Sequence, residues 1–96
     1  DLFDTDDIIY CKADGSYTTV YLKNKQSKIV SRNLKDFENL LVEFGFCRVH
    51  HSSLINLKHV QRYVKGEGGY VVLSENHHVD ISRRKKDEFI KLLDCL

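Results

Sequence analysis

The chain has 96 residues, 42% of them hydrophobic and 10% aromatic, which suits one small globular domain and excludes intrinsic disorder and a multi-domain enzyme. Its 15 lysines and arginines nearly cancel its 14 aspartates and glutamates, so net charge alone indicates no class of partner. No apolar run approaches the roughly 20 residues that a membrane-spanning helix needs.

The first thirty residues predict an antiparallel meander of three strands. Residues 8–13 are apolar and β-prone, and they end at Asp14-Gly15, a pair that favours a tight turn because glycine tolerates positive φ. Residues 17–22 are rich in β-branched and aromatic side chains and predict the returning strand. A polar turn over 23–26 then leads to a third strand over 27–30.

Residues 34–44 change to a helical period. Asn33 can cap the start of this helix, and Gly45 can end it in a left-handed conformation. The apolar residues that recur at helical spacing and predict one buried stripe are Leu34, Phe37, Leu40, Leu41 and Phe44.

The second half of the chain predicts short strands and a closing helix. The expected strands are 46–49, 53–55, 60–64, 70–73 and 78–81, with turns at 66–69 and 74–76. The helix is expected from about residue 83 to 95, with a buried side that carries Phe89, Leu92, Leu93 and Leu96. Helices do not alternate regularly with strands, so parallel βαβ units are excluded. The sequence therefore predicts a mostly β, antiparallel domain with one embedded and one C-terminal helix.

The charged residues are separated along the chain although their totals balance. Residues 1–14 hold five aspartates and one lysine, whereas residues 15–28 hold three lysines and no acid. Residues 44–66 hold four lysines and arginines and three histidines, again without an acid, and Arg83-Arg84-Lys85-Lys86 follow as a block. Such clustering is typical of a site for a polyanion, and a solvated charged surface is the simple alternative.

The block at residues 83–86 lies where helix electrostatics disfavour it. It follows Ser82, the expected N-cap, and so occupies the first turn of the last helix. Cations there oppose the helix dipole, at a cost of about 0.3–1 kcal/mol each at an exposed site. Helix-start amides together with four cations suit phosphate instead. The placement therefore favours anion binding.

The segment Phe46-Cys47-Arg48-Val49-His50-His51-Ser52-Ser53-Leu54-Ile55-Asn56 resembles the hallmark of the LytTR DNA-binding domain, F-x-R-x-H-x-S-x-x-x-N. The similarity extends over about residues 7–93. The other segments that carry it are Ile9-Tyr10, Asp14-Gly15-Ser16-Tyr17-Thr18, Asn33-Leu34-Lys35-Asp36-Phe37, Asn56-Leu57-Lys58-His59-Val60 and Ile81-Ser82-Arg83-Arg84.

The resemblance implies an elongated body of short sheets that serves as the output domain of a bacterial response regulator in a two-component system. Members bind double-stranded DNA at direct repeats as pairs of protomers, and their loops enter successive major grooves while the DNA bends. Since the chain contains no Met, we expect a fragment of such a regulator, with a receiver domain before it. We expect a cytoplasmic protein without a cofactor or a membrane partner, because three cysteines suit a reducing compartment and no signal peptide opens the chain.

The family pattern supplies base contacts from three loops, and the resemblance assigns these contacts to Tyr17, His51 and Arg84. Ser16 or Thr18 takes the place of Tyr17 if the alignment shifts by one residue. The family often has Arg, Lys or Asn where this chain has His51, so the base preferred there stays open.

Six further residues are candidates for DNA phosphate contacts, which supply affinity and register without reading sequence. They are Arg48, His50, Lys58, Arg83, Lys85 and Lys86. His50 has a second interpretation, as a structural histidine that bridges backbone groups. Asn56 and Ser52 are expected to fasten turns and backbone.

Other functions find less support in the sequence. Cys47, His50, His51 and His59 match no standard spacing of zinc ligands, so we expect no metal site. The glycines at 66–69 lack the lysine and the helix of a phosphate loop, and neither a Gly-x-Ser-x-Gly elbow nor paired carboxylates suggest an enzyme. The remaining alternative is a protein-interaction module whose basic face binds an acidic partner.

Overall fold

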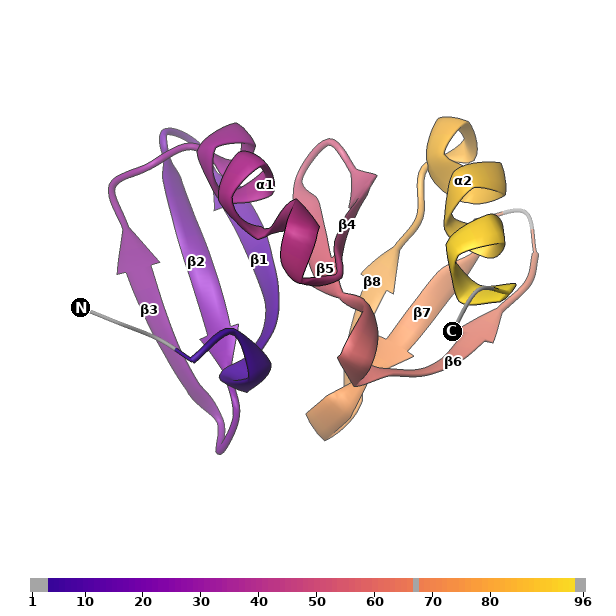
Figure 1. Cartoon of the computed structure of the whole chain (residues 1–96), viewed down its shortest axis with the longest axis horizontal. Coiled ribbons are helices and arrows are strands. Elements are labelled where there is room, and N and C mark those ends of the chain that lie inside the picture. Colours follow the sequence, from indigo (N-terminus) through magenta and orange to yellow (C-terminus); the bar gives the residue numbers. More distant parts are fainter. Residues whose placement is uncertain (1–3, 67, 95–96) are drawn as a thin grey trace.

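The computed structural model describes residues 4–66 and 68–94. In these residues, eight short strands form two antiparallel sheets, and two helices pack against them (Figure 1). The strands are β1 (Ile8–Asp14), β2 (Tyr17–Leu22), β3 (Gln26–Val30), β4 (Phe46–His50), β5 (Ser53–Asn56), β6 (Val60–Val64), β7 (Tyr70–Leu73) and β8 (His77–Asp80). The helices are α1 (Leu34–Leu41) and α2 (Arg83–Asp94), and the single 3-10 turns are η1 (Thr5–Asp7), η2 (Val42–Phe44), η3 (Leu57–His59) and η4 (Ser74–Asn76). The mostly β, antiparallel fold predicted from the sequence is confirmed.

The larger sheet has the strand order β3-β2-β1-β5-β4, and the smaller sheet has the order β6-β7-β8. β1 pairs with β2 such that Asp14 lies opposite Tyr17, and with β5 such that Lys12 lies opposite Ser53. The turn that follows β1 and the turn that precedes β5 therefore lie at the same end of the larger sheet.

Two clusters of buried side chains hold the fold together. One lies between α1 and the larger sheet and contains Ile8, Cys11, Val20, Leu22, Leu34, Leu41, Phe46 and Leu54. The other, which we call the shared core, joins both sheets with α2 and contains Ile9, Tyr10, Cys47, Val49, Ile55, Leu57, Val71, Leu73, Val79, Ile81 and Phe89. Phe89 is fully buried, so it anchors α2 near the middle of the helix.

The elongated shape that the resemblance implied is not confirmed. The molecule measures 36 × 25 × 23 Å along its principal axes and has a radius of gyration of 12.4 Å. A compact domain of this length is expected to have a radius of about 12.5 Å. The shared core explains the compact shape, because it draws the two sheets against each other. In the part of the chain that is described, no helix is long and apolar enough to cross a membrane.

Within the described residues, the predicted helix and strand boundaries hold to within a few residues. Residue 95, the expected end of the last helix, and Leu96 lie outside the described residues. Asn33 caps α1, since its side-chain oxygen accepts a hydrogen bond from the Asp36 N–H at 2.9 Å. Gly45 ends η2 with φ of 88°. The last strand begins at His77, one residue earlier than expected, because His77 pairs with Leu73 across the β7–β8 turn.

The helix over residues 34–44 buries less of its apolar stripe than predicted. Leu34 and Leu41 are buried, whereas Leu40 and Phe44 are 55% and 49% exposed. Leu40 lies about 120° around the helix axis from Leu34, at the border of the stripe. After Leu41 the chain tightens into the 3-10 turn η2, which changes the direction of Phe44. The predicted burial of Leu40 and Phe44 is therefore wrong.

Polar contacts also join the two sheets at the lower edge in Figure 1, opposite the turns that follow β1 and β4. The carboxylate of Glu75 accepts hydrogen bonds from the backbone N–H groups of Asn24 and Lys25 at 2.7 and 2.9 Å. These two bonds hold the pKa of Glu75 below its ordinary value. In addition, Nε2 of His59 donates to the carbonyl oxygen of Asp6 at 2.7 Å, which ties η3 to η1.

Candidate nucleic-acid interface

The three residues expected to contact bases lie on three elements at one edge of the molecule. Tyr17 begins β2, His51 lies in the turn between β4 and β5, and Arg84 lies in the first turn of α2. Figure 1 shows the three elements along the upper edge, spread over the horizontal long axis. Tyr17 is 50% exposed, and His51 and Arg84 are also exposed. The fold thus brings together residues that are far apart in the sequence.

Backbone geometry fixes Tyr17 at this edge. A two-residue turn joins β1 to β2, with Asp14 opposite Tyr17, and Gly15 in this turn has φ of 63°. The N–H of Ala13 donates to the carbonyl oxygen of Ser52 at 2.9 Å, so the β4–β5 turn is tied to the same end of β1. At a strand spacing of about 4.8 Å, the Tyr17 backbone lies roughly 10 Å from the β4–β5 turn.

The start of α2 is tied to β4, the strand that leads into the His51 turn. The N–H of Ser82 donates to the carbonyl oxygen of Val49 at 2.8 Å, and the N–H of Lys85 donates to the carbonyl oxygen of Ser82 at 3.1 Å. Ser82 therefore stands directly before the helix, as the sequence predicted. The first turn of α2 contains no acidic residue, and Arg83 and Arg84 are both exposed. Lys86, on the same turn, is half-buried.

An open hollow of about 510 Å³ lies between α1, the β4–β5 turn and the start of α2. Its lining comes from all three elements and consists of Lys35, Glu38, Arg48, His50, His51, Ser82, Arg83, Arg84 and Lys85. Five of these nine residues are lysine or arginine and one is acidic. A concave surface with this excess of positive charge attracts a polyanion.

Arg48 holds the β4–β5 turn from inside the protein. Its Nε donates to the carbonyl oxygen of His50 at 2.9 Å, and its Nη2 donates to the carbonyl oxygen of His51. Its Nη1 donates to Oε1 of Glu38 at 2.9 Å. The side chain is only 18% exposed, and all three nitrogens of the guanidinium are engaged. This geometry does not favour the phosphate contact predicted for Arg48 and makes it a positioning residue for the turn.

His50 fastens the same turn. The N–H of Ser52 donates to Nδ1 of His50 at 3.2 Å, and the Ser52 hydroxyl lies 2.9 Å from the same nitrogen. Because Nδ1 accepts a hydrogen bond, the neutral ring carries its proton on Nε2, where it is available to a phosphate. The rings of His50 and His51 lie 4.3 Å apart with a tilt of 34°. His50 thus has a structural role, and its outer nitrogen is compatible with a phosphate contact.

Lys58 is not brought together with the other candidates for phosphate contacts. It lies in η3, which follows the end of β5 that is remote from the β4–β5 turn (Figure 1). Its Nζ is 2.7 Å from Oδ1 of Asp6. This hydrogen bond and the charge of Lys58 hold the pKa of Asp6 below its ordinary value. In this structure Lys58 therefore ties η3 to η1.

Asn56 has the fastening role that the sequence predicted. The side chain is 1% exposed. Its Nδ2 donates to the carbonyl oxygens of Ile8 and Thr5 at 2.9 and 3.2 Å, and its Oδ1 accepts from the N–H of Lys58 at 3.0 Å. One buried amide therefore joins η1, β1 and η3.

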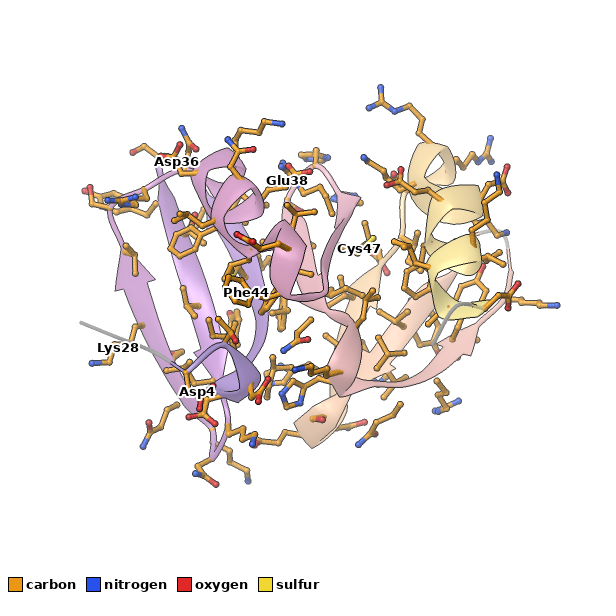
Figure 2. All side chains as sticks on the ribbon, viewed as in Figure 1. Asp4, Lys28, Asp36, Glu38, Phe44 and Cys47 are labelled. Carbon is orange, nitrogen blue, oxygen red and sulfur yellow. The ribbon has the colours of Figure 1, made fainter. Side chains whose placement is uncertain are left out.

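The sequence reasoning missed two residues that line the hollow, Lys35 and Glu38. Both lie on α1, with Nζ of Lys35 3.9 Å from Oε1 of Glu38. Figure 2 shows Glu38 on the side of α1 that faces the β4–β5 turn. The spacing of three residues predicts that the two share a helix face. Which part of the protein this face adjoins depends on tertiary packing, for which the sequence carried no signal.

Within the described parts of the chain, no three His, Cys, Asp or Glu side chains lie close enough to hold a metal ion. Of the four residues considered as zinc ligands, Cys47 and His59 lie apart from the adjacent His50 and His51. Cys47 lies in the shared core, where burial first and the nearby Glu88 second raise its pKa to about 11. His59 lies in η3, at the opposite edge from His50 and His51.

Comparisons with known proteins point to one family and one fold. The family model for the LytTr DNA-binding domain matches residues 2–94. A solved structure described as the LytTr DNA-binding domain of a response regulator from Bacillus cereus matches with a TM-score of 0.84 at 22% identity, over 95% of this chain and 84% of that chain. This likeness shows a shared fold. No curated protein matches the chain.

Proposed function

This chain belongs to the LytTR family of DNA-binding domains, and from that premise we propose that it recognises specific sequences in double-stranded DNA for a bacterial transcriptional regulator. Two protomers bind adjacent direct repeats, and the domain acts as the output domain of a longer chain that carries a receiver domain. The observation that carries the proposal is that three separate elements present exposed side chains at one edge of the molecule, where His51 and Arg84 line a hollow rich in cations.

Three exposed residues read bases, and the cations around them position the duplex. Arg84 can donate two parallel hydrogen bonds to O6 and N7 of a guanine, which is worth about 1–3 kcal/mol of discrimination. His51 donates to a purine from the middle turn, and Tyr17 contacts the neighbouring groove. The residues that contact phosphates are Arg83, Lys85 and Lys86, with Lys35 and the outer nitrogen of His50 beside them.

The length of the molecule supports contacts over about one turn of the duplex. Its longest axis is 36 Å, and B-DNA repeats about every 34 Å. The turn before Tyr17, the His51 turn and the start of α2 follow one another along this axis (Figure 1). We propose that the outer two of these three elements reach successive major grooves, and that a bend of the DNA toward them adds specificity that depends on its shape.

A binding selection from a randomised duplex pool at about physiological salt tests the proposal. We expect enrichment of a short sequence that recurs at about one helical turn. A bound pool without enrichment would mean a non-specific DNA binder. If no DNA were retained, the protein-interaction alternative would replace DNA binding.

Two neighbouring substitutions then separate base reading from positioning. Arg84→Ala should cost about 1–3 kcal/mol and relax the preference at one base position. Lys85→Ala should weaken all sequences alike and lower the salt slope by about one. Lys91→Ala is the matched control, because Lys91 is an exposed cation in the last turn of the same helix. Identical behaviour of the first two variants would contradict this division of roles.

A substitution of His51 tests its contact with a base. His51→Ala should relax the preference at one base position and cost about 1–3 kcal/mol of discrimination there. If the selected sequence keeps the same preference at every position, His51 reads no base.

A further inference from the structure

Glu38 stands out because it places a negative charge in the hollow that the cations form. It is the one acidic residue among those that line the hollow. An acid at this place repels a polyanion, so affinity for DNA alone would disfavour it. The Glu38 side chain is 24% exposed, with Arg48 at 2.9 Å and Lys35 at 3.9 Å from its Oε1. These contacts direct the carboxylate into the protein.

The contacts continue from Glu38 to the backbone of the His51 turn. Glu38 accepts from Nη1 of Arg48, and the other two nitrogens of that guanidinium donate to the carbonyl oxygens of His50 and His51. A long arginine side chain loses rotamer freedom when it makes such contacts. Because the Glu38 carboxylate binds the third nitrogen, it holds the guanidinium of Arg48 in place before DNA binds.

The backbone that carries Glu38 is fixed, because α1 packs against the larger sheet. Leu34 and Leu41, on either side of Glu38 in the chain, are 3% and 7% exposed and belong to the cluster below the helix. The Glu38 carboxylate and the Arg48 guanidinium therefore connect the His51 turn to α1, in addition to the hydrogen bond that ties Ser52 of this turn to β1.

We propose that Glu38 is a positioning residue for base recognition: through Arg48 it keeps the β4–β5 turn in the shape that presents His51 to a base, and it keeps the guanidinium away from the DNA phosphates. This inference rests on the proposed function. Without the carboxylate, Nη1 of Arg48 turns to a phosphate, and the turn loses its brace. Base discrimination then falls while general affinity for DNA rises.

Two variants of Glu38 separate its charge from its hydrogen bond. Glu38→Ala removes both, whereas Glu38→Gln removes the charge and keeps an oxygen that accepts from Arg48. Both should bind random-sequence duplex about twofold to fivefold more tightly than wild type, because a repelling charge is lost. At the base pair whose preference disappears in His51→Ala, Glu38→Ala should lose about tenfold of discrimination, and Glu38→Gln should stay within about twofold of wild type.

The control variant is Glu43→Gln, which removes an exposed acid from η2, outside the lining of the hollow. It should leave the discrimination unchanged. A merely structural role of Glu38 would weaken specific and random DNA together and lower the thermal stability, so this pattern would overturn the inference. Equal discrimination in Glu38→Ala and wild type would overturn it as well.

A measurement without DNA keeps the inference distinct from the proposed function. In the ¹H–¹⁵N NMR spectrum, the Nε–H of Arg48 should exchange slowly with solvent in wild type and Glu38→Gln, and fast in Glu38→Ala. Slow exchange in all three proteins would show that Glu38 does not hold Arg48, whatever the DNA result. If wild type failed to discriminate between sequences, the proposed function would fall, and the recognition role of Glu38 would fall with it.

Discussion

Substitution of Asn56 gives a sharp test of the structure, because one buried amide makes three hydrogen bonds. Asn56→Ala removes all three and leaves the carbonyl oxygen of Ile8 and the N–H of Lys58 without this partner. A hydrogen bond contributes about 0.5–1.5 kcal/mol net, so the expected loss is roughly 2–4 kcal/mol. For a domain of this length that is a large part of a total near 5–14 kcal/mol.

Asn56→Asp sharpens the test, because the two side chains have the same shape. The carboxylate has no proton at neutral pH, so it places an oxygen 2.9 Å from the carbonyl oxygen of Ile8, where Nδ2 donated before. The variant should lose more than Asn56→Ala at about pH 7, since it also buries a charge.

Urea unfolding, followed by circular dichroism, measures both variants and wild type. The slope of the unfolding free energy against urea should stay constant, so that the midpoint reports stability directly. A loss below about 1 kcal/mol for Asn56→Ala, or an Asp variant more stable than the Ala variant at neutral pH, would contradict the three hydrogen bonds.

Three further predictions address charge and burial. Burial raises the pKa of Cys11 to about 12, and burial together with Glu88 raises that of Cys47 to about 11. Neither thiol should therefore react with a disulfide reagent at about pH 8 until the protein unfolds, and the Cys95→Ser variant limits the measured reaction to these two thiols. The pKa of Glu75 is lowered in the folded state, so its stabilising contribution is present above the unfolded pKa and is lost as the pH falls through the folded pKa. Between about pH 5 and 3, wild type should therefore lose more stability than Glu75→Gln, and an equal dependence of stability on pH in the two proteins would contradict this. Lys58→Ala breaks an exposed ion pair, so it should change the stability little and leave DNA affinity within about twofold. A loss of affinity like that of a phosphate contact would place Lys58 on the DNA.

Local patterns in the sequence predicted the elements, because each depends on neighbours in the chain. Alternation and β-branched residues marked the strands, and Asn33 and Gly45 marked the ends of the helical segment. The width of the buried stripe was overestimated at Leu40 and Phe44. Helical period alone does not set how far a sheet wraps around a helix, nor where a helix tightens after its last buried residue.

The candidate site was predicted only where the motif itself carried it. His51 and Arg84 line the same hollow, and their contacts with bases stay predictions. Lys58 lies close to His51 in sequence, yet the strand between them carries it toward the other edge at about 3.3 Å per residue. The pair of Glu38 and Arg48 joins a helix to a turn, so it depends on long-range packing that no local pattern encodes.

The cluster below α1 can form during synthesis before the second half of the chain has been made, whereas the shared core cannot. All eight members of the cluster below α1 lie between Ile8 and Leu54, so the first half of the chain contains a complete core of its own. The smaller sheet buries its inward side chains only against the shared core, six of whose eleven members precede Val60. The emerging chain can thus form the larger sheet with Tyr17 and His51 in place, and that sheet becomes the template on which the smaller sheet and α2 condense. Of the three residues that we propose to read bases, Arg84 is the last to take its position.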